Sequence, residues 1–103
     1  MIKYSLTRDN KYTHFKVEGH AGFKSKPGEF DIVCGLVSAL AQTALYGCAK
    51  YSKSTRATLD NSICKEGLLS FYFPKSCKEA NAVAESAFYG IQQVEQQFPQ
   101  CFE

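Results

Sequence analysis

The run Ile32–Ala49, IVCGLVSALAQTALYGCA, contains no charged side chain. Asp31 stands directly before it and is a favourable N-cap, so we expect a helix to begin here. The run includes Ser38 and Gln42 and is shorter than the roughly 20 apolar residues that span a bilayer, so we expect no membrane span. A helix that is apolar around most of its surface is buried on more than one side. A small sheet covers one side, and the other needs a second helix or a partner subunit. We therefore expect a homodimer.

Two strand-like runs precede this helix. In the first, Ile2, Tyr4 and Leu6 alternate with polar residues, and in the second, Tyr12–Glu18, alternation places Thr13, Phe15 and Val17 on one face. This period is typical of half-buried strands, and the polar residues 8–11 between them supply a turn. The two runs predict a β-hairpin.

Two further strand-like runs and a second helix follow. Thr55–Leu59 is the weaker strand pattern and Leu68–Phe73 the stronger. Ser76–Glu79, SCKE, has the pattern of a capping box and predicts a helix that Pro99 ends. The order β-β-α-β-β-α predicts an α+β fold for one domain, residues 1–103. We expect a four-stranded, mainly antiparallel sheet packed with two helices.

The charge balance argues against nucleic-acid binding. The chain has 12 Lys and Arg residues and 10 Asp and Glu residues, a net charge of +2, and its lysines are scattered among acids. Domains that bind nucleic acids usually concentrate basic residues on one face. We therefore expect no direct contact with nucleic acid.

The cysteines indicate free thiols. There are five, an odd number, and none of their spacings matches a metal-binding pair. The N-terminal residues alternate with charges where a secretory signal would be apolar. We expect a cytoplasmic protein with reduced thiols, no metal and no cofactor. We also expect Cys48, Cys64, Cys77 and Cys101 to be buried in the core.

The residues best suited to chemistry are His20 and Cys34. His20 lies in the glycine-rich segment Gly19–Gly22, GHAG, and Cys34 lies in the first turn of the expected helix. The N–H groups and dipole at a helix start favour a thiolate, and an imidazole is the usual base that generates one. Each residue also has a simpler explanation, since cysteines in apolar helices are usually buried and loop histidines usually solvated. The pair indicates a cysteine nucleophile with a histidine base.

Three neighbours of Cys34 have candidate supporting roles. Asp31 either caps the helix, which we favour, or orients His20 as the third member of a triad. The N–H groups of Cys34 and Gly35 are candidates for an oxyanion hole. Ser38, one turn further, either contacts substrate, supports the thiol, or is buried and bonds back to its own helix.

The segments GHAG at 19–22, Gly28, DIVC at 31–34 and VSAL at 37–40 resemble the signature of the ribosomal-processing cysteine protease family, Prp, also called YsxB-like proteins. The resemblance implies that His20 and Cys34 are the catalytic pair and that Gly19 and Gly22 belong to the site. It further implies a small cytoplasmic α+β homodimer. Such proteins remove the N-terminal extension of a large-subunit ribosomal protein, forming an acyl-enzyme on the cysteine.

Two features depart from the family pattern. The loop between GHAG and Asp31 is two residues longer, which bears on substrate fit, and Gly35 replaces the usual Ala or Ser. The longer loop leaves the chemistry intact. We expect Gly19–Phe30 to form a flap that closes over the peptide, with Phe23 and Phe30 as walls of an apolar groove.

Two other functional classes compete with the protease. A non-catalytic ribosome-associated or RNA-binding protein would need a basic face with stacking aromatic rings. A redox-sensing thiol protein would need a resolving cysteine close to Cys34, and Cys48 is about 21 Å further along the same helix by its rise.

Overall fold

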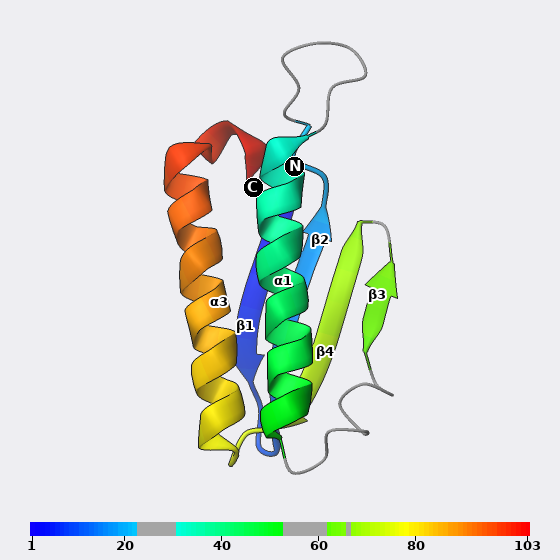
Figure 1. Cartoon of the computed structure of the whole chain (residues 1–103), viewed down its shortest axis with the longest axis vertical. Helices are drawn as coiled ribbons and strands as arrows, with labels where there is room; N and C mark the ends of the chain where they lie inside the picture. The colour runs from blue at the N-terminus through cyan, green and yellow to red at the C-terminus, as the bar shows by residue number, and fades with distance from the viewer. Residues whose placement is uncertain (23–30, 53–61, 66) are drawn as a thin grey trace.

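The computed structural model describes residues 1–22, 31–52, 62–65 and 67–103. Its elements follow the predicted order β-β-α-β-β-α (Figure 1). They are β1 (Ile2–Arg8), β2 (Tyr12–Gly19), α1 (Ile32–Tyr51), β3 (Ile63–Lys65), β4 (Leu68–Pro74), α3 (Lys78–Gln97) and the short 3-10 helix η1 (Pro99–Cys101).

The strands form one antiparallel sheet in the order β1-β2-β4-β3. The predicted hairpin is confirmed, since β1 pairs with β2 from Ile2 opposite Gly19 to Arg8 opposite Thr13. An isolated parallel bridge between Ile2 and Phe102 ties the end of the chain to its beginning. Both termini therefore lie near the start of α1 (Figure 1).

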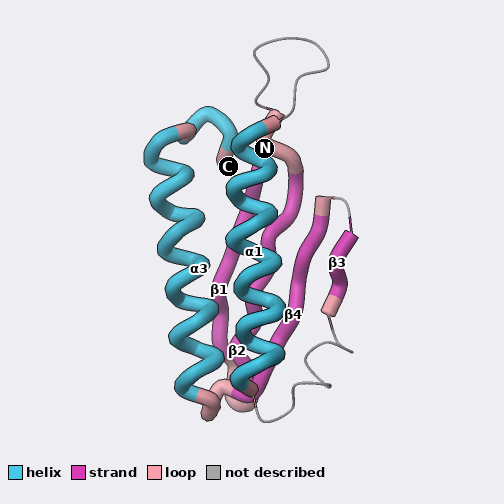
Figure 2. The backbone as a smooth tube through the Cα atoms, viewed as in Figure 1, coloured by secondary structure: helices cyan, strands magenta, loops and turns pink. Residues whose placement is uncertain are grey.

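Both helices lie side by side on one face of the sheet, so the domain has two layers (Figure 2). The alternation read from the sequence is confirmed, because the buried strand residues all point to the helix layer. They are Ile2 on β1, Thr13, Phe15 and Val17 on β2, and Leu69, Phe71 and Phe73 on β4. From β1, the Tyr4 hydroxyl donates a hydrogen bond to Glu95 on α3, which fixes that helix over the edge strand.

Helix α1 packs against α3 and the sheet through seven buried residues but keeps an outward apolar side. Ile32, Leu36 and Tyr46 are 52%, 43% and 60% exposed. By length and composition α1, with a mean hydropathy of 1.6, passes the test for a membrane-crossing helix, as core helices of globular proteins also do. One such helix is weak evidence for a membrane span.

Two details of the second half differ from the sequence predictions. The run Thr55–Leu59 lies outside the described residues, and the described partner of β4 is the short strand Ile63–Lys65, which was not predicted. The capping box is wrong, because Cys77 is the N-cap of α3 and makes no side-chain cap hydrogen bond. The Cys77 N–H donates to the Pro74 carbonyl at 3.0 Å, which closes a turn and leaves Ser76 outside the helix.

Of the four cysteines other than Cys34, all predicted to be buried, three are buried in the structure. Cys48, Cys77 and Cys101 are buried, whereas Cys64 is exposed. Cys64 lies in an edge strand of three residues, where little packs over it. All five cysteines are free thiols in the structure.

Candidate active site

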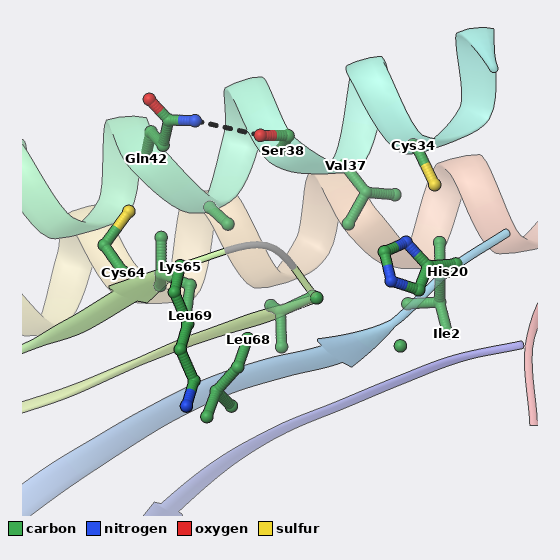
Figure 3. A pocket seen from close by; sticks show the side chains of 14 residues that line it. Ile2, His20, Cys34, Val37, Ser38, Gln42, Cys64, Lys65, Leu68 and Leu69 are labelled. Carbon is green, nitrogen blue, oxygen red and sulfur yellow. Dashed lines mark hydrogen bonds between the residues drawn. The ribbon is translucent and has the colours of Figure 1, made fainter.

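A cavity of about 380 Å³ lies between α1 and the adjoining ends of the sheet strands. Figure 3 shows that His20, Cys34, Ser38 and Cys64 line it from three different elements. His20 enters from the end of β2, Cys34 and Ser38 from α1, and Cys64 from β3. The structure therefore brings together the two residues that the sequence singled out, although they come from separate segments.

Cys34 is held in the first turn of α1 by Asp31. The Asp31 carboxylate accepts a hydrogen bond from the Cys34 N–H at 3.0 Å, and the Asp31 carbonyl accepts one from the Gly35 N–H at 3.1 Å. The predicted N-cap is thus confirmed. The same contacts correct the predicted oxyanion hole, because Asp31 already occupies both of the N–H groups assigned to it.

The environment of the Cys34 thiol opposes its ionisation in this state. Burial raises the pKa of Cys34, and the hydrogen bond and negative charge of Asp31 raise it further. The backbone N–H groups of Ala21 and Gly22 act in the opposite direction and lower the pKa. The net shift of the Cys34 pKa is upward, so the thiol favours its protonated form in this state. A base is needed.

His20 lies beneath the Cys34 thiol with its side chain exposed (Figure 3). Among the described residues no hydrogen bond joins the imidazole to the sulfur. Catalytic contacts are often long in free enzymes and tighten on substrate binding, so this geometry is compatible with His20 as a general base.

The turn between β3 and β4 makes room for the His20 ring. Gly67 has a φ of +78°, and a Cβ there would lie 2.9 Å from His20 Nε2, too close for the ring to stay in place. The Gly67 carbonyl also accepts a hydrogen bond at 2.9 Å from the N–H of Gly19, the residue before His20. Gly67 therefore limits where the imidazole can lie.

The structure settles the position of Ser38. Its side chain is exposed and its hydroxyl accepts a hydrogen bond from Gln42 Nε2 at 2.9 Å. The predicted burial of Ser38 is therefore wrong, although the serine does bond to its own helix, through the Gln42 side chain one turn further. Ser38 and Gln42 instead form a polar edge of the cavity beyond Cys34 (Figure 3).

Gly67, Gln42 and Cys64 also line the cavity, and none of them was predicted from the sequence. A signal existed for Gly67, since a glycine directly before a strong strand pattern marks a turn. Nothing in the sequence brings Cys64 next to α1. Phe23, Phe30 and the rest of the expected flap beyond Gly22, residues 23–30, lie outside the described residues. Within the described part of the chain, no group of three or more His, Cys, Asp or Glu residues is arranged to hold a metal ion.

Comparison with known proteins identifies the family. The family model of the cysteine protease Prp matches residues 1–103, the whole chain. This chain belongs to the cysteine protease Prp family. It is therefore a cysteine protease, as the resemblance predicted.

A solved structure shares the fold. The crystal structure of an essential ribosomal processing protease Prp from S. aureus, in complex with a covalently linked product peptide, superposes with a TM-score of 0.69. The alignment covers 100% of this chain and 96% of that one, at 17% sequence identity. No curated protein matches the chain significantly in sequence.

Proposed function

We propose that this protease removes the N-terminal extension of a large-subunit ribosomal protein, with Cys34 as nucleophile and His20 as general base. The observation that carries the proposal is that His20 and Cys34 line one cavity in a chain that matches a cysteine protease family throughout. The similarly folded S. aureus protein is a ribosomal processing protease with a covalently linked product peptide, which supports the same substrate class here.

The reaction follows from the positions of these groups. The His20 imidazole takes the proton of the Cys34 thiol, and a sulfur electron pair forms a bond to the scissile carbonyl carbon. The carbonyl π pair moves to oxygen and gives a tetrahedral oxyanion. Its return breaks the C–N bond, while the imidazolium gives its proton to the leaving amine. Water then hydrolyses the thioester with His20 again as base.

The cavity has the composition that an extended peptide requires. Val37, Ala41 and Leu69 provide an apolar surface behind Cys34, and Ser38 and Gln42 add a polar edge. Apolar surface with a few polar groups is typical of sites that bind side chains and fix a backbone. The family assignment also favours an enzyme over the non-catalytic ribosome-associated or RNA-binding alternative.

We also propose that the protein is a cytoplasmic homodimer. The exposed apolar residues on the outer side of α1 support the dimer, because a partner subunit would cover Ile32, Leu36 and Tyr46, which are about half exposed in the single chain. The five free cysteines are consistent with a reducing compartment.

Cleavage of a synthetic peptide tests the proposal directly. The peptide carries the N-terminal extension and the first residues of the mature ribosomal protein, and products are identified by mass spectrometry. Wild-type protein should release the extension at one bond, and Cys34→Ser protein should not. Binding of the peptide without cleavage by the wild type would favour the non-catalytic alternative.

A further inference from the structure

A backbone N–H group of the GHAG segment is bonded to the Cys34 sulfur. The Ala21 N–H donates a hydrogen bond to Cys34 Sγ at 3.1 Å, and the neighbouring Gly22 N–H lowers the pKa of the same thiol. Ala21 is buried, so its backbone is fixed against the core. The first N–H groups of α1 that could compete, those of Cys34 and Gly35, are bonded to Asp31.

The backbone conformation changes directly after this donor. Gly22 has a φ of +67°, whereas no described residue other than glycine, Ala21 included, has a positive φ. Successive N–H groups form a concave anion-binding arrangement where an αR residue precedes an αL residue, and Gly22 has the positive φ that the second residue of such a pair needs. In this protein the group next to the Ala21 N–H is the sulfur that becomes a thiolate.

We propose that the Ala21 and Gly22 N–H groups form the oxyanion hole. The inference rests on the proposed function and adds the groups that stabilise its tetrahedral intermediate. When the C–S bond forms, negative charge leaves the sulfur and appears on an oxygen two bonds away. A donor 3.1 Å from Sγ is within hydrogen-bonding reach of that oxygen, so the same N–H groups stabilise the thiolate first and the oxyanion next.

This assignment gives the GHAG segment two tasks. It carries the base, His20, and directly after it the donors that receive the displaced charge. The two groups therefore move together with one short segment relative to Cys34. Asp31 in turn caps the helix, so the Cys34 and Gly35 N–H groups bind Asp31 and not the oxyanion.

Backbone esters test the inference without changing a side chain. One semisynthetic protein has lactic acid in place of Ala21, which removes the N–H, and a second has glycolic acid in place of Gly22. The comparison protein has glycolic acid in place of Gly35, whose N–H bonds to the Asp31 carbonyl. Each is assayed for cleavage of the ribosomal extension peptide and for alkylation of Cys34 by iodoacetamide, a reaction that forms no oxyanion.

Loss of one oxyanion-hole donor typically costs about 10²–10³-fold in kcat. We expect this loss for the Ala21 and Gly22 esters with little change in KM, and a smaller fall in the alkylation rate. The Gly35 ester should lose less than about tenfold in kcat. Equal falls in cleavage and alkylation would assign these N–H groups to the thiolate alone and overturn the inference, as would a larger loss for the Gly35 ester.

The assay also separates this inference from the proposed function. An active wild type with fully active Ala21 and Gly22 esters overturns the inference alone. A wild type that does not cleave the peptide overturns the proposed function, and the inference with it.

Discussion

Replacement of Asp31 by Asn should raise the reactivity of Cys34. The Asp31 carboxylate raises the pKa of the Cys34 thiol, after the larger contribution of burial, through its hydrogen bond and its negative charge. Asparagine keeps an oxygen that can accept from the Cys34 N–H and removes the charge. Because the pKa then falls, the thiolate fraction at neutral pH increases, and alkylation of Cys34 by iodoacetamide should be faster than in the wild type.

The stability change can be worked out from the same contacts. Asp31→Asn loses the attraction between a carboxylate and the helix start, about 0.3–1 kcal/mol. Asp31→Ala loses this and also the cap hydrogen bond of 3.0 Å to the Cys34 N–H, about 1 kcal/mol more. For a domain of this size, that difference corresponds to about 4–8 °C in Tm. Thermal unfolding followed by circular dichroism should therefore rank the proteins wild type, Asn, Ala.

Peptide cleavage by the same variants separates the two roles of Asp31. If Asp31 only caps the helix, Asp31→Asn should keep kcat within about tenfold of the wild type. Replacing the aspartate of a serine-protease triad by asparagine lowers kcat by about 10⁴-fold. A loss of that size, or slower alkylation of Cys34 in Asp31→Asn, would refute the capping account.

Three further predictions concern other parts of the molecule. Gly67→Ala should displace the His20 ring and lower kcat by about 10²-fold. NMR should show the displacement as a shifted His20 imidazole signal, and an unchanged signal would contradict the prediction. Light scattering at micromolar concentration should give twice the 11.5 kDa chain mass. Leu36→Lys should shift the measured mass towards that of the monomer, and a monomeric wild type would count against the dimer. Burial raises the pKa of Cys48 from the ordinary thiol value of 9.0 to about 12. Because the thiol therefore ionises more readily in the unfolded state, the folded state loses stability as the pH rises between these two values. Urea unfolding of Cys48→Ala should show a weaker loss over these pH values, and an identical pH dependence would exclude Cys48 as a cause.

The sequence predicted the elements whose patterns are strongest. The structure confirms the strand predicted from the alternation of Thr13, Phe15 and Val17, because alternation indicates burial of one face. It also confirms the helix predicted from the uncharged run of α1, because such a run indicates burial on several sides. Local hydrogen bonding was harder to predict. Ser76 has the residue type of a cap, yet a turn at Pro74 places the helix start one residue later.

The sequence predicted which two residues belong to the candidate site but not how the groups around them are arranged. His20 and Cys34 were singled out by their loop and helix contexts, and their shared cavity is a property of the tertiary fold. The N–H groups at the helix start were assigned to the oxyanion, but the Asp31 side chain binds the Cys34 N–H, which depends on a side-chain conformation, and the Asp31 carbonyl binds the Gly35 N–H as the first helical hydrogen bond. Gly67 and Cys64 join the site through pairing of β3 with β4, which the sequence did not predict.

The most direct test of the central claim is the rate at which Cys34→Ala protein cleaves the ribosomal extension peptide. His20→Ala is measured beside it, and Cys48→Ala, whose side chain is buried away from the cavity, is the control. The account predicts no cleavage by Cys34→Ala or His20→Ala above the rate without protein, and retained cleavage by Cys48→Ala. Cleavage by folded Cys34→Ala at the wild-type rate would contradict the assignment of the nucleophile.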